Sequence, residues 1–65
     1  DKQLSNREKE ILRLIRQGFL SKEIAYQLGV SIYTVNNHRK NILSKLDANN
    51  IMEAIHIVEN LGIYL

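Results

Sequence analysis

Apolar residues recur along most of this chain at spacings of three and four, the periodicity of an amphipathic helix. Four such stretches are separated by short polar or glycine-containing segments, and strand-like alternation never lasts for more than a few residues. The pattern therefore predicts an all-α fold, a bundle of four helices. The expected inward positions are Ile11, Leu12, Leu14 and Ile15; Ile24, Ala25 and Leu28; Val35, Ile42 and Leu46, with Leu43 at the edge; and Ala54, Ile55, Val58 and Leu61.

Residues that begin and end helices flank each stretch. Ser5 and Glu8 have the spacing of a capping box, and Asn50 and Glu53 repeat it. Ser21 and Ser31 are expected as the N-caps of the second and third helices. Glycines at positions 18, 29 and 62 are placed to end the first, second and fourth helices. The third helix is expected to run from about 32 to 46.

The second and third helices are joined by only Gly29, Val30 and Ser31. So short a link fits a sharp crossing of the two helices, as in a helix-turn-helix over residues 21–40. Ala25 is small where the helices would cross, and Gly29 suits a turn that needs a positive φ. A chance match in an ordinary helical hairpin is the alternative.

The outer face of the predicted third helix carries Tyr33, Asn36, Asn37, Lys40, Asn41 and Ser44. Asparagine is a poor helix former, so three of them within one helix oppose its local propensity. Asparagine amides match adenine edges, and lysine suits the acceptors of guanine. We therefore predict base contacts from Asn36, Asn37 and Lys40. The competing interpretation is a set of ordinary surface polar residues.

Charge is distributed unevenly, although the net charge is only +2. Residues 31–46 contain three cations and no acid, whereas residues 47–65 contain three acids and no lysine or arginine. This favours an anionic partner at one face, with two solvated helix faces as the plainer alternative. Helix starts and flanking side chains are expected to position DNA phosphates, and the candidates are Ser21, Lys22, Ser31, Tyr33, Thr34, His38, Arg39, Asn41 and Lys45.

Composition narrows the remaining classes of function. The 65 residues make one domain without cysteine, which fits a reducing cytoplasm, and no apolar run approaches the length of about 20 residues needed to span a membrane. No cofactor or metal site is predicted, because no second His, Cys or carboxylate stands at ligand spacing with His38, and His56 is expected at the surface or an interface. His38 is expected to be a partly buried support. We do not expect an enzyme, since no nucleophile stands beside a base.

The chain resembles the LuxR/NarL-type (GerE-like) helix-turn-helix domain, an output domain of bacterial transcription regulators. The resemblance spans nearly the whole chain and rests on residues 4–18, 21–46 and 53–64, including Thr34-Val35, His38 and Lys45-Leu46. It implies that the third helix is the recognition helix, which enters the major groove of double-stranded DNA. It also places the family's base-reading positions on Asn36, Asn37 and Lys40.

The resemblance further implies a homodimer that pairs through the fourth helix. The residues expected at this surface are Ile51, Met52, Ile55, His56 and Glu59. Ile51 replaces a common arginine, and Leu20 replaces a small polar residue or proline. Surplus apolar side chains on a small domain are an equally good explanation of Ile51, Met52 and Ile57. Residues 1–65 would be one domain of a longer cytoplasmic regulator with an N-terminal receiver or sensor.

A second function remains open at this point. The acidic and apolar fourth helix also suits a protein-interaction or dimerisation module that has lost specific DNA binding. Tight self-association without retention on DNA would favour that alternative.

Overall fold

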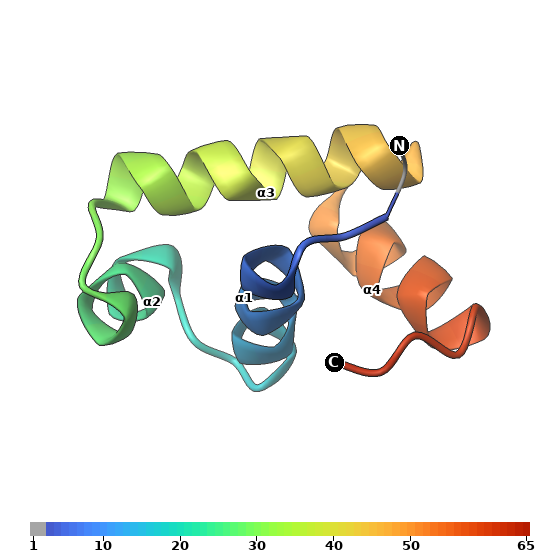
Figure 1. The fold of residues 1–65 in the computed structure, drawn as a ribbon, viewed down its shortest axis with the longest axis horizontal. Helices are drawn as coiled ribbons and strands as arrows, with labels where there is room; N and C mark the ends of the chain where they lie inside the picture. Colours follow the sequence, from blue (N-terminus) through green and yellow to red (C-terminus); the bar gives the residue numbers. More distant parts are fainter. Residues whose placement is uncertain (1–2) are drawn as a thin grey trace.

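The computed structural model describes residues 3–65 and contains four helices with no strand among those residues. They are α1 (Asn6–Arg16), α2 (Ser21–Leu28), α3 (Ile32–Leu46) and α4 (Ile51–Asn60). Figure 1 shows α3 lying across the other three helices, with α2 under its N-terminal part, α1 under its middle and α4 under its C-terminal part. The predicted all-α bundle is confirmed. One long side of α3 is left without a covering helix.

One apolar cluster holds the four helices together. Its fully buried members come from every helix and are Ile11, Leu12, Ile24, Val35, Ile42, Ala54 and Val58. Val35 and Ile42 face inward from α3, and Leu46 packs against the cluster while partly exposed. Burial of these side chains is the main stabilising contribution, at about 25 cal/mol for each Å² of apolar surface removed from water. The position of α3 is therefore set chiefly from its inner side.

Three of the four predicted N-caps, Ser5, Ser31 and Asn50, accept the expected backbone hydrogen bond. The Ser5 hydroxyl accepts from the Glu8 amide at 3.1 Å, and Glu8 Oε1 accepts from the Ser5 amide at 2.8 Å, which completes the capping box of α1. The Ser31 hydroxyl accepts from the Thr34 amide at 3.0 Å at the start of α3. These bonds satisfy backbone donors that a helix start otherwise leaves without a partner.

The predicted cap of α2 is wrong. Ser21 is already the first helical residue, and the residue before it, Leu20, takes the extended N-cap conformation without a side-chain acceptor. Glu23 Oε1 instead accepts from the Leu20 amide at 2.7 Å. Half of a capping box is therefore enough to begin this short helix. The signal was present in the sequence as a glutamate three residues after Leu20.

Two details of α4, its N-terminal cap and the exposure of Leu61, differ from the prediction. The Asn50 side chain accepts from the Glu53 amide at 2.9 Å as predicted. The Glu53 carboxylate, however, accepts from the Asn49 amide at 2.8 Å and not from the Asn50 amide, as a capping box would require. Leu61 was expected on the inner face, yet it is 67% exposed. Leu61 keeps the helical backbone conformation, and its amide donates to the Ile57 carbonyl at 2.9 Å, but at the end of α4 it lines an open groove instead of packing in the core.

Candidate nucleic-acid interface

The turn between α2 and α3 has the backbone geometry that its sequence predicts. Gly29 ends α2 in the left-handed conformation, with φ at +68° and ψ at 33°. Its amide and that of Val30 donate to the carbonyls of Tyr26 and Ala25, which closes the last turn of α2. Ala25 is buried, and Ser31 then caps α3. The two helices are thus joined by Gly29, Val30 and Ser31 alone.

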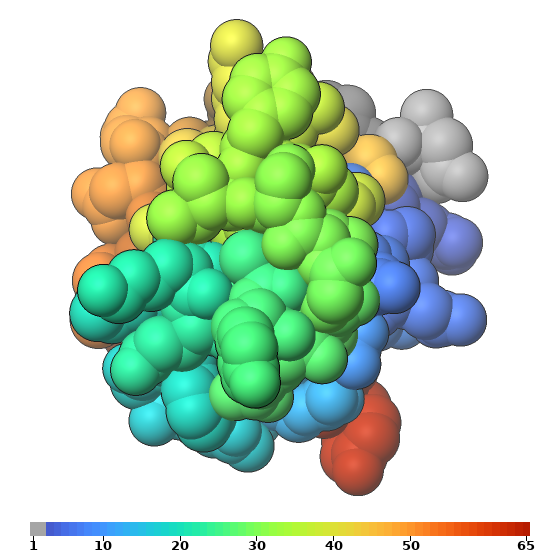
Figure 2. Space-filling model, turned by 90° about the vertical axis from the view of Figure 1, so that its left-hand side faces the viewer, coloured from blue at the N-terminus to red at the C-terminus, as the bar shows by residue number. Residues whose placement is uncertain are grey.

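The outer side of α3 is open to solvent along its length. Tyr33 is 76% exposed. The other exposed residues on this face are Asn36, Asn37, Lys40, Asn41 and Ser44. In Figure 2, which looks onto the end of the molecule that carries the turn, α3 forms a ridge above the side chains of α2. A helix that stands out in this way has the shape needed to enter a groove about 12 Å wide.

The three predicted base-contacting side chains lie together on that ridge. Asn36, Asn37 and Lys40 are all exposed, and their spacing puts them on one face of α3. No hydrogen bond or ion pair occupies their polar groups within residues 3–65. Their donors and acceptors are therefore available to a ligand. The described part of α3 also lacks any acidic residue, so no carboxylate on this helix repels an anion.

The predicted phosphate-contacting residues fall in different places. Lys22 is exposed at the start of α2, beside the partly buried Ser21, and Asn41 is exposed on a flank of α3. His38 and Arg39 are partly buried on opposite flanks. The Ser31 and Thr34 hydroxyl oxygens lie 3.0 Å apart and share a hydrogen bond in the first turn of α3. These groups border the outer face rather than form one cluster.

Lys45 does not fit with the rest of that set. Its Nζ lies 2.8 Å from Glu8 Oε1 and also donates to the carbonyl of Gln3 at 3.3 Å. The sequence assigned Glu8 only to the cap of α1, and its pairing with a residue 37 positions away was missed. No local sequence pattern predicts this contact, because it depends on how α1 and α3 cross. In this structure Lys45 points to its own domain instead of outward to a phosphate.

The surface predicted for dimerisation is only partly available. Met52 is 74% exposed, and His56 and Glu59 are exposed beside it on α4. Ile51 is partly buried against the core. Ile55 is 8% exposed and belongs to the core, so it offers almost no surface to a second copy. The burial of Ile55 follows from its place three residues before Val58 on the inner face of α4.

Other kinds of site are not apparent in the described residues. No group of three or more His, Cys, Asp or Glu side chains within residues 3–65 is arranged to hold a metal ion. None of the helices in that range has both the length and the apolar character required to cross a membrane.

A short helix and a longer one, joined by a three-residue turn and with the longer helix open along its outer side, define a helix-turn-helix domain. The chain belongs to the luxR family of bacterial regulatory proteins, whose family model matches residues 2–58. This is a family of DNA-binding transcription regulators and not a class of enzymes.

Individual relatives agree with this assignment. An uncharacterized response regulatory protein of Escherichia coli (strain K12), YgeK, is 48% identical over 63 residues, which cover 97% of this chain and 43% of that protein. The response regulator protein TmoT of Ectopseudomonas mendocina is 38% identical over 58 residues, which cover 89% of this chain and 26% of that protein. The chain thus spans less than half the length of either relative.

Two solved structures share the fold. The transcription factor GerE superimposes with a TM-score of 0.87 at 37% identity, covering 91% of this chain and 88% of that one. SdiA of Escherichia coli superimposes with a TM-score of 0.89 at 40% identity, covering 100% of this chain and 27% of that one.

Proposed function

We propose that this domain binds double-stranded DNA at specific sequences, with α3 as the recognition helix in the major groove. The observation that carries the proposal is the solvent-open, acid-free outer side of α3 in a domain of a DNA-binding family. Its 15 residues give a helix of about 22 Å, long enough to follow the floor of a groove over several base pairs.

Asn36, Asn37 and Lys40 are the residues that read the sequence in this proposal. The amides of Asn36 and Asn37 each offer a donor and an acceptor, which is the pattern needed for adenine, and Lys40 donates to the acceptors of guanine. Contacts to phosphate come from the edges of the ridge and set its register. The residues proposed for them are Ser21, Lys22, Ser31, Tyr33, Thr34, His38, Arg39 and Asn41.

The test begins with selection of bound sites from a random DNA pool, followed by affinity measurements on the selected site and on random duplex. Lys40→Ala should weaken specific binding by about 1–3 kcal/mol and relax the preference at one base pair. Lys22→Ala is the matched control: it removes the same charge from α2 and should weaken binding to both duplexes alike. Equal losses on both duplexes for Lys40→Ala would contradict the assignment of this residue to a base.

The same experiment separates this function from a protein-interaction module. Retention on DNA at low salt that declines with added salt is expected for a protein that neutralises phosphates. No retention on either duplex, together with self-association in solution, would instead favour a module that binds only protein.

We also propose that two copies pair through α4 when they bind DNA. Met52, His56 and Glu59 supply the exposed part of that surface, and Ile51 adds a partly buried edge. Met52→Asp should abolish cooperative binding to paired half-sites while leaving binding to a single half-site nearly unchanged. Tyr64→Asp is the control, because Tyr64 is 91% exposed but lies beyond α4. Cooperativity that survives Met52→Asp would exclude Met52 from the pairing surface.

We further propose that this domain is the output part of a longer regulator with a receiver or sensor domain. Support comes from relatives that bear response-regulator names and of which this chain spans only 43% and 26%. Those names favour a receiver.

A further inference from the structure

An ion pair joins the start of α1 to the end of α3. Glu8 lies in the first turn of α1 with only 5% of its side chain exposed, and Lys45 lies in the last turn of α3 with 32% exposed. Their charged atoms are 2.8 Å apart, the length of a charge-assisted hydrogen bond. Glu8 Oε1 also accepts from the Ser5 amide at 2.8 Å, which fixes the carboxylate in place.

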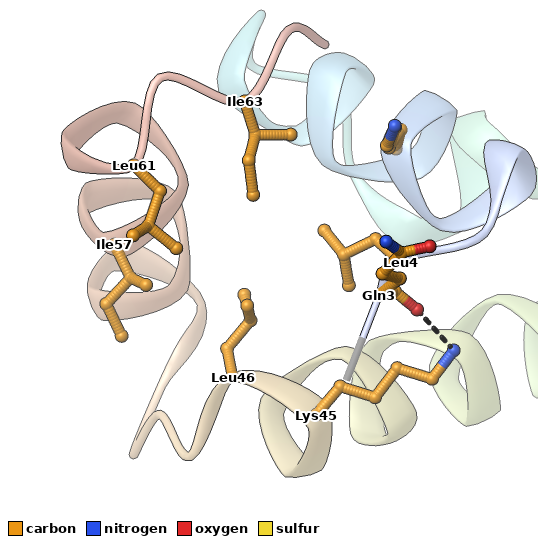
Figure 3. Close-up of a pocket in the computed structure, with 8 residues that line it drawn as sticks. Gln3, Leu4, Lys45, Leu46, Ile57, Leu61 and Ile63 are labelled. Carbon is orange, nitrogen blue, oxygen red and sulfur yellow. Dashed lines mark hydrogen bonds between the residues drawn. The ribbon is translucent and has the colours of Figure 1, made fainter. Parts of the chain in front are cut away.

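Lys45 is held from two sides. Besides Glu8, its Nζ donates to the Gln3 carbonyl at 3.3 Å. Figure 3 shows the side chain extending from α3 along one wall of a groove toward that carbonyl, with Leu4, Leu46 and Ile63 also around the groove. The ammonium group is thereby directed to α1 and the segment ahead of it.

The core holds α3 through residues on its inner side, and Leu43 and Leu46 near its C-terminal end are only partly buried against it. Its two fully buried residues, Val35 and Ile42, are seven positions apart, or about 10 Å along the helix axis. Apolar contacts are not directional, so they define the tilt of a helix less strictly than a hydrogen-bonded ion pair does. The Glu8–Lys45 pair adds a directional anchor at the C-terminal end, beyond Ile42.

Small changes of tilt matter at the recognition face. Asn36 lies six residues from the buried Ile42, or about 9 Å along the axis, so a rotation of about 10° about Ile42 displaces Asn36 by about 1.5 Å. Hydrogen bonds to base edges require placement to within about 0.5 Å. An anchor at Lys45 therefore acts on residues that it does not touch.

We propose that Glu8 and Lys45 are positioning residues that set the tilt of α3 on α1 and so determine how well Asn36, Asn37 and Lys40 meet their bases. The inference rests on the proposed function, and it revises the role of Lys45: this lysine holds the recognition helix instead of a phosphate.

Glu8→Gln gives the sharpest test, because the two roles predict opposite signs. Removing a negative charge strengthens DNA binding on electrostatic grounds alone. Loss of the charge from the anchor weakens it, and we expect about 5–10-fold weaker binding to the selected site with little change on random duplex. The glutamine Oε1 keeps an acceptor for the Ser5 amide and for Lys45 Nζ, so the cap of α1 is retained and only the charge of the pair is removed. Circular dichroism establishes that each variant is folded at the temperature of the binding measurement.

Variants of Lys45 provide a second, independent test of the proposal. Lys45→Met keeps the aliphatic stem and should lower the ratio of specific to random binding as Glu8→Gln does, without changing the salt dependence. If Lys45 contacted a phosphate, its replacement would instead lower the slope of log affinity against log salt concentration by about one unit. Lys45→Arg preserves the charge and should restore the ratio. Lys9→Met is the matched control, since Lys9 lines the same groove without an ion pair within residues 3–65.

The double variant completes the test. Glu8→Gln with Lys45→Met should lose no more specificity than Lys45→Met alone, because both changes act on the same contact. The proposal is overturned if Glu8→Gln binds the selected site as tightly as the original chain or more tightly, or if Lys45→Met reduces the salt slope. Failure of the original chain to prefer any site is a different result: it would overturn the proposed function, and this inference with it.

Discussion

The hydroxyl of Ser31 is bonded twice to Thr34, once through the Thr34 amide at 3.0 Å and once through the Thr34 hydroxyl at 3.0 Å. These bonds fix the first turn of α3 where it leaves the turn that joins it to α2. Loss of the cap by Ser31→Ala should lower the free energy of unfolding by about 1 kcal/mol, measured by urea denaturation. Ser21→Ala is the control, because Ser21 does not cap α2, and its effect should stay within about 0.5 kcal/mol.

Glu8 makes the stability of the domain depend on pH. Burial raises the pKa of its carboxyl, but the hydrogen bonds from Lys45 and Ser5 and the charge of Lys45 outweigh burial and hold the pKa below its ordinary value of 4.5. A carboxyl with a lowered folded-state pKa stabilises the fold above its unfolded-state pKa, and this contribution is lost as the pH falls through the folded-state pKa.

The free energy of unfolding should therefore decline as acid is added below about pH 4.5. In Glu8→Gln this part of the decline should be absent, so the stability difference between the two proteins narrows with falling pH. Urea midpoints measured from neutral pH to about pH 3 provide the comparison. A constant difference across that range would show that the carboxylate charge contributes nothing.

The features that the sequence predicted correctly depend on residues close together in the chain. Ser5 with Glu8 and Ser31 with Thr34 are three residues apart, and Gly29 follows directly from the end of α2, so their geometry is decided locally. The exposure of Asn36 on the outer face follows in the same way from its spacing to the buried Val35 and Ile42.

The features that the sequence could not predict depend on tertiary packing or on where a helix stops. Glu8 and Lys45 are 37 positions apart, and only the crossing of α1 and α3 brings them together. Leu61 continues the apolar period of α4, but at the end of that helix no other element of residues 3–65 covers it and it lines an open groove. The base, phosphate and dimer assignments of the remaining residues stay predictions, because they concern partners outside the chain.

Val58 and Leu61 allow a direct test of how apolar spacing along a helix differs from burial in the core. Both satisfy the apolar spacing of the fourth helix, yet Val58 is fully buried and Leu61 is 67% exposed. Val58→Ala removes two buried methyl groups and should cost about 2 kcal/mol of unfolding free energy. Leu61→Ala removes a larger side chain but should cost less than about 0.5 kcal/mol. A larger loss at Leu61 in urea denaturation would mean that this residue packs against the domain in solution.

Asp47 ends α3 in the left-handed backbone conformation, which favours glycine. Its φ of 53° is the only positive value at a non-glycine residue in the described part of the chain. Glycine adopts this region without a Cβ penalty, and a carboxylate at a helix C-terminus lies next to the negative end of the helix dipole. Asp47→Gly should therefore stabilise the domain by about 0.5–1 kcal/mol, seen as a higher urea midpoint.

Asp47→Asn separates the two contributions at this position. Asparagine removes the charge and tolerates the left-handed conformation better than most residues, but it keeps the Cβ atom. The charge effect alone should give it about 0.3–1 kcal/mol over aspartate at low salt, and added salt should reduce that gain. Glycine should exceed asparagine by an amount that salt does not change, since it reflects backbone conformation. If the two variants are equally stable at high salt, the left-handed backbone at Asp47 carries no strain.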